Sequence, residues 1–351
     1  MGEHTGGPMI GRVSVIVPAR DAAATLAECL ASLRAQDWPR EALELVCVDD
    51  GSTDATPRIA GELADRVLRT AEAPAGPAAA RNAGAAAAVG DVLVFLDADV
   101  VAPPGMVRAL AGALFEDPGL AAAFGSYDAA PRHEGLVSTY RNLLHHYVHQ
   151  TSRSEAETFW AGCGAIRRSA FQRLGGFDGR RYPRPSIEDI ELGRRMRAAG
   201  MRIRLLPHVQ VTHLKRWTLA DVVRTDVQAR GVPWARLLLD DLHLAPGGAR
   251  EVGDLNLRPA ALASAPLAWA SLLLLPAALI RPKLAAVSGG LAAVVAALNA
   301  PLTAFFWRAR GPGFAAATLP LQLLYHLCNG VSVALALAER LRSGRRGRRD
   351  A

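Results

Sequence analysis

The final third of the chain is too apolar for an ordinary soluble surface. Three stretches, 259–280, 284–307 and 314–338, each approach the roughly 20 residues needed to cross a bilayer. Short turns that carry basic residues, 281–283 and 308–313, separate them. A buried helical core is the alternative. Three such stretches in succession favour a transmembrane region of two or three helices over 259–338.

The first 258 residues follow another pattern, in which short β-branched runs alternate with amphipathic segments. Alternation at this spacing is typical of a parallel sheet covered by helices, so the predicted fold class is α/β. The predicted strands are 12–18, 43–48, 67–69 and 91–96, then 119–126, 158–167, 201–206 and 209–213 in a more mixed region. The predicted helices are 26–33, one capped by Thr53 or Asp54, 78–89 and 188–199.

Acidic residues follow the second and fourth predicted strands. Because open α/β sheets bind ligands at the carboxyl ends of their strands, both clusters are expected on one rim. The first, Asp49 and Asp50, can accept hydrogen bonds from a nucleobase and a ribose. In the second, Asp97 and Asp99 point to one side and can share Mg²⁺ or Mn²⁺, which bridges a diphosphate. An ordinary turn and a capped strand end are the simpler alternatives.

A third acidic pair, Glu188 and Asp189, begins a predicted helix. The helix dipole stabilises an ionised carboxylate there, and an ionised carboxylate can act as a general base towards a hydroxyl. A structural helix cap explains the pair equally well. Arg81 and Asn82 begin another predicted helix, a suitable place for sugar or phosphate contacts.

Seven motifs in this order resemble those of glycosyltransferase family 2, whose members have the GT-A fold. They are VPARD at 17–21, VDDGSTD at 48–54, ARNAG at 80–84, LDAD at 96–99, GCGAIRR at 162–168, GGFD at 175–178 and EDIELG at 188–193. The resemblance extends over residues 12–213, and the combination is highly specific. It implies an inverting transfer from a nucleotide-activated sugar, assisted by a divalent metal.

The resemblance also implies roles for individual residues. Pro18, Ala19, Asp49 and Asp50 are expected to hold the base and ribose of the donor, with Arg81, Asn82 and Asp97 completing the donor site. Asp97 and Asp99 are expected to bind Mg²⁺ or Mn²⁺, with His213 near the diphosphate as a third ligand. Asp189 is the expected catalytic base, and Glu188 is expected to contact the acceptor.

One motif of the family is not intact. Processive members carry Q-x-x-R-W, whereas the comparable region here reads QARGVPW at 228–234. This departure favours transfer of a single sugar, although Arg230 and Trp234 remain available for pyrophosphate or acceptor contacts. One alternative is a nucleotidyltransferase, but this sequence lacks the glycine-rich basic loop expected after the first strand of such an enzyme. Another is an inactive membrane scaffold, but such a protein would be expected to have lost acidic residues that are present here.

The charge distribution and the cysteines indicate the expected binding partner and the redox compartment of the protein. Much of the net charge of +7 lies in a basic tail, 339–351, and no nucleic-acid motif accompanies it, so anionic lipid is the expected partner rather than nucleic acid. A disordered tail that keeps the protein soluble is the alternative. The four cysteines form no C-x-x-C pair and are expected to be free thiols in a reducing compartment.

These observations predict four segments: a GT-A catalytic domain at 1–231, an amphipathic interfacial connector at 232–258, transmembrane helices at 259–338 and the basic tail. The expected location is the inner (plasma) membrane, multi-pass, with the catalytic domain in the cytoplasm. The expected partners are a nucleotide-sugar donor, first of all a UDP-sugar, and a lipid or lipid-linked acceptor. If the chain crosses the membrane twice, the basic tail returns to the cytoplasm. If it crosses three times, the tail lies outside.

Overall fold

The computed structural model describes residues 11–70, 74–244, 255, 258–278 and 280–347. The chain divides into two compact units. The first, here called the sheet unit, comprises Met1–Asp128 and Arg153–Leu214; the second, the helical unit, comprises Ala129–Ser152 and Lys215–Ala351. The predicted boundaries at 231 and 258 therefore differ from the divisions between these units, and the four-segment scheme stays a prediction.

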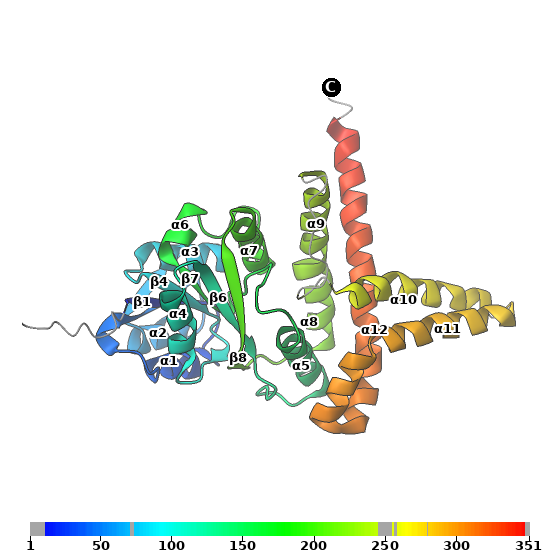
Figure 1. The fold of residues 1–351 in the computed structure, drawn as a ribbon, viewed down its shortest axis with the longest axis horizontal. Helices are drawn as coiled ribbons and strands as arrows, with labels where there is room; N and C mark the ends of the chain where they lie inside the picture. Colours follow the sequence, from blue (N-terminus) through cyan, green and yellow to red (C-terminus); the bar gives the residue numbers. More distant parts are fainter. Residues whose placement is uncertain (1–10, 71–73, 245–254, 256–257, 279, 348–351) are drawn as a thin grey trace, which may run out of the picture. The chain divides into compact units, whose positions relative to one another are not determined.

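The sheet unit contains eight strands in the order β3-β2-β1-β4-β7-β6-β8-β5 (Figure 1). Their bounds are β1 Val13–Ala19, β2 Leu43–Asp49, β3 Arg66–Arg69, β4 Val92–Leu96, β5 Val100–Val101, β6 Leu120–Tyr127, β7 Cys163–Arg167 and β8 Arg202–His213. The first four in space are parallel, whereas β7 runs antiparallel to both β4 and β6. β5 is likewise antiparallel to β8.

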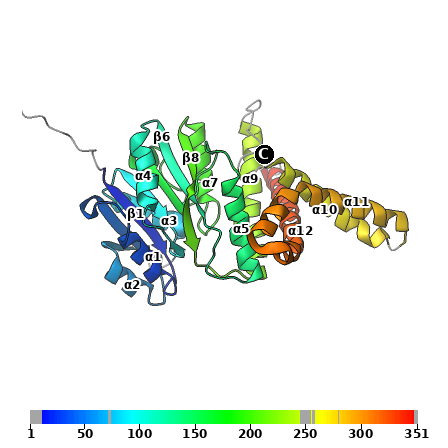
Figure 2. The ribbon, with the colours of Figure 1, turned by 60° about the horizontal axis from the view of Figure 1, so that its bottom comes forward.

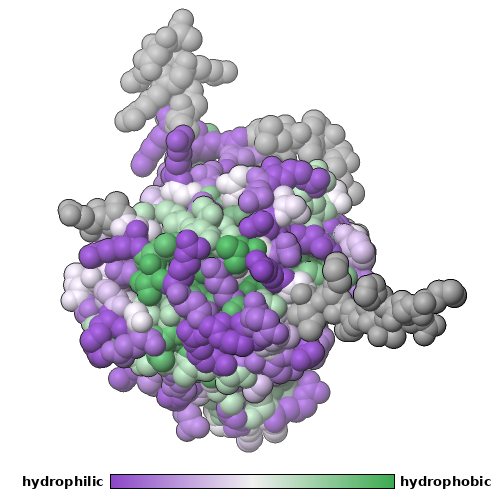
Figure 3. Space-filling view, turned by 90° about the vertical axis from the view of Figure 1, so that its left-hand side faces the viewer, coloured by the Kyte–Doolittle hydropathy of each residue, from purple (hydrophilic) through white to green (hydrophobic). Residues whose placement is uncertain are grey.

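The strands at the centre are apolar because both of their faces are covered. Every residue of β4 is buried, as are six of the seven residues of β1. The helices of this unit are α1 Leu26–Arg34, α2 Thr56–Leu63, α3 Pro77–Ala87, α4 Met106–Glu116, α6 Arg168–Arg173 and α7 Glu188–Ala198, with a 3₁₀ turn at Arg40–Ala42. The view from the side of the sheet unit is mainly hydrophilic, as expected for a surface in contact with water (Figure 3).

Most predicted strands and helices are confirmed, and three predicted strands need correction. The segment 201–213 forms one continuous strand, β8, rather than two, because it continues through Pro207 with only a register shift against β6. The predicted strand at 158–167 begins only at Cys163. Residues 158–162 instead form a loop that carries Trp160 over the site described below.

The helical unit contains α5 Leu136–Gln150, α8 Leu219–Arg224, a π-helical turn η2 Thr225–Gly231, α9 Val232–Leu244, α10 Pro259–Ala278, α11 Pro282–Leu298 and α12 Ala300–Gly347 (Figure 2). Among the residues that the structure describes, two helical segments qualify as membrane spans by length and composition: Pro259–Ala277 and Ala300–Arg342. α11 is apolar but shorter. The second predicted apolar stretch, 284–307, is divided between α11 and α12 at Asn299.

Candidate active site at the carboxyl edge of the sheet

The acidic clusters predicted from the sequence lie at one edge of the sheet. β1, β2 and β4 are parallel, so their carboxyl ends meet there. Pro18 pairs with Val48, and Ala19 pairs with Asp49. The backbone N–H of Asp50 donates to the carbonyl of Ala19 at 2.8 Å. The structure thus brings together the residues predicted to hold the base and ribose.

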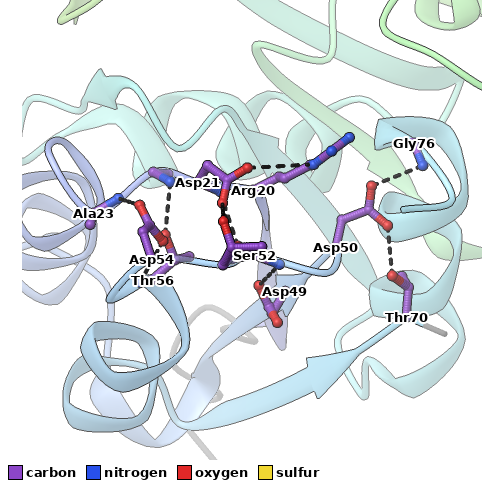
Figure 4. A network of polar contacts seen from close by, with 12 residues as sticks. Arg20, Asp21, Ala23, Asp49, Asp50, Ser52, Asp54, Thr56, Thr70 and Gly76 are labelled. Carbon is purple, nitrogen blue, oxygen red and sulfur yellow. Dashed lines mark hydrogen bonds and ion pairs between the residues drawn. The ribbon is translucent and has the colours of Figure 1, made fainter. Parts of the chain in front are cut away.

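A network of polar contacts joins the loop after β1 to the loop after β2 (Figure 4). The Asp21 N–H donates to Ser52 Oγ at 3.0 Å, and the Thr53 N–H donates to Asp21 Oδ1 at 2.8 Å. The Ala23 N–H donates to Asp54 Oδ2 at 3.0 Å. These polar residues therefore fix the shape of the rim, a role that the motif alone does not reveal.

The two carboxylates of the first acidic pair have different environments. Asp50 is buried and accepts three hydrogen bonds, from Thr70 Oγ1 at 2.6 Å, from the Ala75 N–H at 2.9 Å and from the Gly76 N–H at 2.8 Å. Gly76 has φ of +88°, a conformation that glycine adopts without strain. Asp50 therefore anchors the start of α3 (Figure 4).

Asp49 is buried as deeply, but only one of its oxygens has a hydrogen bond. Its Oδ1 accepts from the Ser52 N–H at 3.1 Å. Its Oδ2 is buried and accepts no hydrogen bond from any described residue, since the Nε of the exposed Arg69 lies 3.6 Å away. A buried carboxylate oxygen without a donor is costly, so this atom is the one suited to accept a ligand N–H or O–H.

Arg81 joins the second acidic cluster to the third. Its guanidinium is buried, with Nη2 2.7 Å from Asp97 Oδ1 and Nη1 2.8 Å from Glu188 Oε1. Its Cζ lies 5.6 Å from the centre of the Phe177 ring. Although burial acts to lower the pKa of Arg81, the carboxylates of Asp97 and Glu188 outweigh it and raise that pKa. The side chain is therefore a permanent cation between two acidic motifs.

The neighbouring Asn82 is engaged within the protein. Its Nδ2 donates to the Phe177 carbonyl at 2.8 Å, and its Oδ1 accepts from the Phe177 N–H at 2.9 Å. This two-way contact fixes the turn that follows α6. The predicted contact of Asn82 with the donor stays a prediction, because both the nitrogen and the oxygen of its amide are hydrogen-bonded to Phe177.

Asp99 lies beside His213, as the strand pairing requires. β5 pairs with β8 so that Val100 faces His213, and the Leu214 N–H donates to the Asp99 carbonyl at 2.8 Å. The Nε2 of His213 lies 3.6 Å from Asp99 Oδ2. The His213 ring stacks on Tyr127 with centroids 4.3 Å apart and an interplanar angle of 14°.

These side chains supply part of the ligand set that a divalent cation needs. Within the described residues, no group of three or more His, Cys, Asp and Glu side chains forms a ready-made metal site. Asp99 and His213 are adjacent, whereas Asp97 gives one oxygen to Arg81. Burial raises the pKa of Asp97, the nearby Asp99 acts in the same direction, and Arg81 opposes them. This partial set fits a cation that takes its other ligands from a diphosphate.

Asp189 lies in the first turn of α7, where its carboxylate is held by backbone. Its Oδ2 accepts from the Ala161 N–H at 3.0 Å, and its Oδ1 accepts from the Ile190 N–H at 2.8 Å. The loop 158–162, which carries Ala161, can approach α7 because Gly193 has no side chain. A Cβ at Gly193 would lie 2.2 Å from the Phe159 nitrogen. Gly193 thus allows the close approach that positions Asp189.

Glu188 is more enclosed than its predicted contact with the acceptor suggests. It is 4% exposed, with Oε1 bonded to Arg81 and Oε2 accepting from the Ser186 N–H at 2.9 Å. Its role as an acceptor contact therefore stays a prediction, whereas its bond to Arg81 is a feature of the structure.

Sequence reasoning did not identify two aromatic residues near the site. Trp160 packs edge-on against Tyr127, with ring centroids 4.9 Å apart, and Tyr127 stacks on His213. Tyr127 directly follows the predicted strand 119–126 and is the last residue of β6, so its position at a strand end is the available signal. Nothing in the local sequence marks Trp160, because the pattern there predicts a strand and not a loop.

Comparison with known proteins points to one family. Residues 14–175 match the sequence profile of glycosyl transferase family 2, and residues 141–217 match a profile described as the N-terminal domain of galactosyltransferase. A pre-mycofactocin glycosyltransferase of Mycobacterium tuberculosis is 32% identical over 61% of this chain and 45% of its own length. A probable glycosyltransferase of Bacillus subtilis is 27% identical over 56% of this chain and 49% of its own. The chain thus spans about half the length of these curated relatives.

Among solved structures, a mannosyltransferase from Pyrobaculum calidifontis in complex with GDP-Man and Mn²⁺ has a similar fold. The similarity covers 92% of this chain and 87% of that one, with a TM-score of 0.54 and 21% identity. S. aureus TarS 1–349 in complex with UDP-GlcNAc covers 95% of this chain and 92% of its own, with a TM-score of 0.50 and 19% identity. At these identities the likeness concerns the fold alone.

Proposed function

Because the chain belongs to glycosyl transferase family 2 and has the GT-A fold, we propose that it transfers a single sugar, with inversion, from a nucleotide-sugar donor to a hydroxyl or phosphate acceptor. The acceptor is a lipid or lipid-linked molecule. The proposal goes beyond the relatives, since the chain covers only about half of their length.

The observation that carries this proposal is the Arg81 bridge. It connects Asp97, at the end of β4, with Glu188, at the start of α7, through contacts of 2.7 and 2.8 Å. A donor held at Asp97 and Asp99 would therefore lie close to the helix that carries the proposed base. Proximity of this kind supports a single displacement, in which donor and acceptor react within one site.

For the donor, Asp49 is the proposed contact to the base or ribose. Its buried Oδ2 lacks a hydrogen bond from any described residue, and a ligand N–H or O–H would supply one. Pro18 and Ala19 lie beside it on β1. A UDP-sugar is the donor we propose first, and a GDP-sugar is the competing choice that the same carboxylate would accept.

For the metal, Asp99, His213 and the second oxygen of Asp97 are the groups that would hold Mg²⁺ or Mn²⁺. A bound divalent cation would neutralise charge on the diphosphate leaving group. Arg81 keeps the carboxylate of Asp97 in place, and the stacked ring of Tyr127 orients His213.

For the acceptor, Asp189 is the proposed general base. A hydroxyl is a poor nucleophile at neutral pH, so its proton must be removed as the bond to the sugar forms. The N–H groups of Ala161 and Ile190 orient the Asp189 carboxylate. The start of α7 also favours its ionised form.

The same proposal includes association with a membrane through the apolar helices, with the sheet unit in the cytoplasm, where nucleotide sugars are made. Support comes from the two helical segments that are long and apolar enough to cross a bilayer. The altered motif around Arg230 supports transfer of one sugar rather than a polymer. In the structure this region is the π-helical turn η2.

A donor screen tests the proposal. The full chain in detergent is incubated with UDP-, GDP- and dTDP-sugars, with Mn²⁺ or Mg²⁺, and both thermal stabilisation and nucleotide release are measured. One donor class should stabilise the protein and turn over, and EDTA or Asp99→Ala should abolish turnover. Asp37→Ala is the control, because it removes a carboxylate from a surface ion pair with Arg108. If no donor binds, or if EDTA and Asp99→Ala leave turnover intact, the proposal is wrong.

A further inference from the structure

We propose that α10 and α11 form the membrane-crossing element as a helical hairpin, and that α12 lies along the membrane surface instead of crossing it. The proposal refines the membrane association included in the proposed function and makes no use of sugar transfer. It places the carboxyl-terminal tail on the same side of the membrane as the sheet unit.

The dimensions of the hairpin suit a bilayer. α10 has 20 residues and α11 has 17, which correspond to about 30 and 25 Å at 1.5 Å per residue. α10 contains no charged side chain, and the only one in α11 is Lys283, in its first turn. Large apolar side chains along the hairpin are exposed: Leu262, Leu272, Leu273, Leu275, Ile280, Val287 and Val294. Lipid is the partner that fits such a surface.

Within the hairpin, the polar groups bond to one another. Ser271 Oγ donates to the Ser288 carbonyl at 2.9 Å, and Ser288 Oγ donates to the Ser271 carbonyl at 2.8 Å. Reciprocal bonds of this kind satisfy hydroxyl groups where no water is available. The charged residues Arg281 and Lys283 lie at the turn between the two helices, where a full crossing would bring them to the opposite surface.

α12 differs because it is not one straight helix. Gly311 has φ of 84° and ψ of 172°, which breaks the helix into a short arm and a long arm. The short arm, 300–310, corresponds to about 16 Å, too short to cross. It folds back on the long arm, as shown by the contact of 3.3 Å between Thr303 Oγ1 and Gln322 Oε1.

The long arm of α12 packs against helices that carry charges. Ser332 Oγ lies 3.4 Å from the Asp226 carbonyl, and Asp226 forms a buried ion pair of 2.7 Å with Arg141. Further along, Glu339 pairs with Arg236 of α9. If this arm crossed the bilayer, these partners would enter the hydrocarbon core, where charged side chains are strongly disfavoured.

The opposite face of the long arm is apolar and exposed. It carries Leu319, Leu323, Val333 and Leu337. A helix with one face packed on charged neighbours and one exposed apolar face suits the boundary between headgroups and acyl chains. In both ribbon views the α10–α11 hairpin projects away from α12, as a hairpin inserted below a surface helix would (Figures 1 and 2).

Polar groups also gather where the hairpin meets α12. The Asn299 side chain, directly after α11, donates to Ser264 Oγ of α10 at 2.9 Å, and its Oδ1 lies 3.2 Å from His326 Nε2 of α12. Nearby, Trp269 Nε1 donates to the Leu327 carbonyl at 3.0 Å. These polar contacts tie the end of α11 and the first half of α10, as far as Trp269, to α12.

The distribution of basic residues sets the orientation. The turn of the hairpin carries Arg281 and Lys283, whereas its base side carries Arg258, Arg308, Arg310 and the arginines of the tail. An excess of Lys and Arg marks the cytoplasmic side. The sheet unit precedes the hairpin in the chain, and no candidate span in the described residues lies before α10. The sheet unit is therefore on the same, cytoplasmic side of the membrane as the base of the hairpin.

Site-specific labelling tests this topology in the full chain. All four native cysteines are buried free thiols, so single introduced cysteines can be labelled with a membrane-impermeant maleimide. In intact bacterial cells, Lys283→Cys should be labelled, and Ser343→Cys should be labelled only after permeabilisation. Labelling of Ser343→Cys in intact cells would show that α12 crosses, and protection of Lys283→Cys until permeabilisation would show that the hairpin does not. Either result overturns the proposal.

A pair of matched arginine substitutions gives an independent readout. Leu273 in α10 and Leu323 in α12 are both exposed, at 68% and 43%. Leu273→Arg should reduce the fraction of protein that resists carbonate extraction, because its charge would lie within the hydrocarbon core. Leu323→Arg should not, because arginine at the surface can reach the headgroups. Equal loss in the two variants, or loss in Leu323→Arg alone, contradicts the proposal. Neither readout requires activity, so the topology and the proposed reaction can fail separately.

Discussion

Glu188 Oε1 lies 2.8 Å from Arg81 Nη1, a contact between residues 107 positions apart in the chain. It joins the second turn of α3 to the start of α7. The same guanidinium also holds Asp97, so the two acidic motifs that follow β4 and begin α7 share one cation. This shared cation explains how the buried carboxylate of Glu188 and the partly buried carboxylate of Asp97 can lie at the same edge of the sheet.

Arg81→Met should destabilise the protein strongly. Glu188, whose side chain is 6% exposed, would remain buried without its partner, and Asp97, whose side chain is 32% exposed, would lose the same contact. Breaking a buried pair from one side costs about 3–5 kcal/mol. The free energy of unfolding, measured with denaturant on the full chain in detergent, should fall by that order. Arg58→Met is the matched control, because its ion pair with Glu62 is exposed on both sides, and it should change little. Equal stability of the two variants would mean that the Arg81 bridge is not structural.

Asp49→Asn and Asp50→Asn should have different effects although the residues are adjacent. Asp50→Asn replaces one of the two acceptor oxygens by an NH2 group, which cannot accept from Thr70 and Ala75 at one position or from Gly76 at the other, so stability should fall by about 1–3 kcal/mol. Asp49→Asn should leave stability nearly unchanged and weaken nucleotide binding. Thermal unfolding and donor titration of the two variants measure both effects. Reversal of this pattern would make Asp50 the donor contact.

Asp65 should make the sheet unit sensitive to acid. It accepts from the Leu45 N–H at 2.8 Å and pairs with Arg34 and Arg40. Although partial burial opposes the shift, these bonds lower the pKa of Asp65 from its usual 3.8. Because the pKa is lower in the folded state than in the unfolded state, the stabilisation is present above pH 3.8 and is lost as the pH falls through the folded value.

The measurement for this site compares wild type with Asp65→Asn across pH. After allowance for screening by solvent, the difference in unfolding free energy at neutral pH should be about 0.5–1 kcal/mol. It should shrink as the pH falls below 3.8. A difference that stays constant with pH would show that the ionised carboxylate contributes nothing.

The parallel half of the sheet was predictable because its residues satisfy simple local rules. The runs that became β1, β2 and β4 are β-branched, short and bounded by polar turns, so they could only be buried strands. Helix α7 was predicted from Glu188 onward because its acidic first turn marks a helix start. The edge location of Asp49 and Asp97 followed from strand order along the chain.

The remaining features depend on contacts between distant segments. Antiparallel β7 enters between β4 and β6, and no local pattern sets that order. The pairing of Asp50 with Thr70 and Gly76, and of Asn82 with Phe177, arises only when the loops meet. Hydropathy predicts where the apolar helices lie along the chain. It does not predict the break in α12 at Gly311, because that break depends on a backbone conformation with positive φ.

The most direct test of the proposed reaction separates donor binding from sugar transfer in Asp189→Asn. The substitution keeps the shape of a side chain held by Ala161 and Ile190 and removes its ability to take a proton. Calorimetry with the donor identified in the screen should give an affinity close to that of wild type. Transfer of the radiolabelled sugar to extracted membrane lipid should fall by about 10²–10⁴. Transfer at a near-normal rate in Asp189→Asn, together with its loss in Glu188→Gln, would contradict the account and assign the base to Glu188.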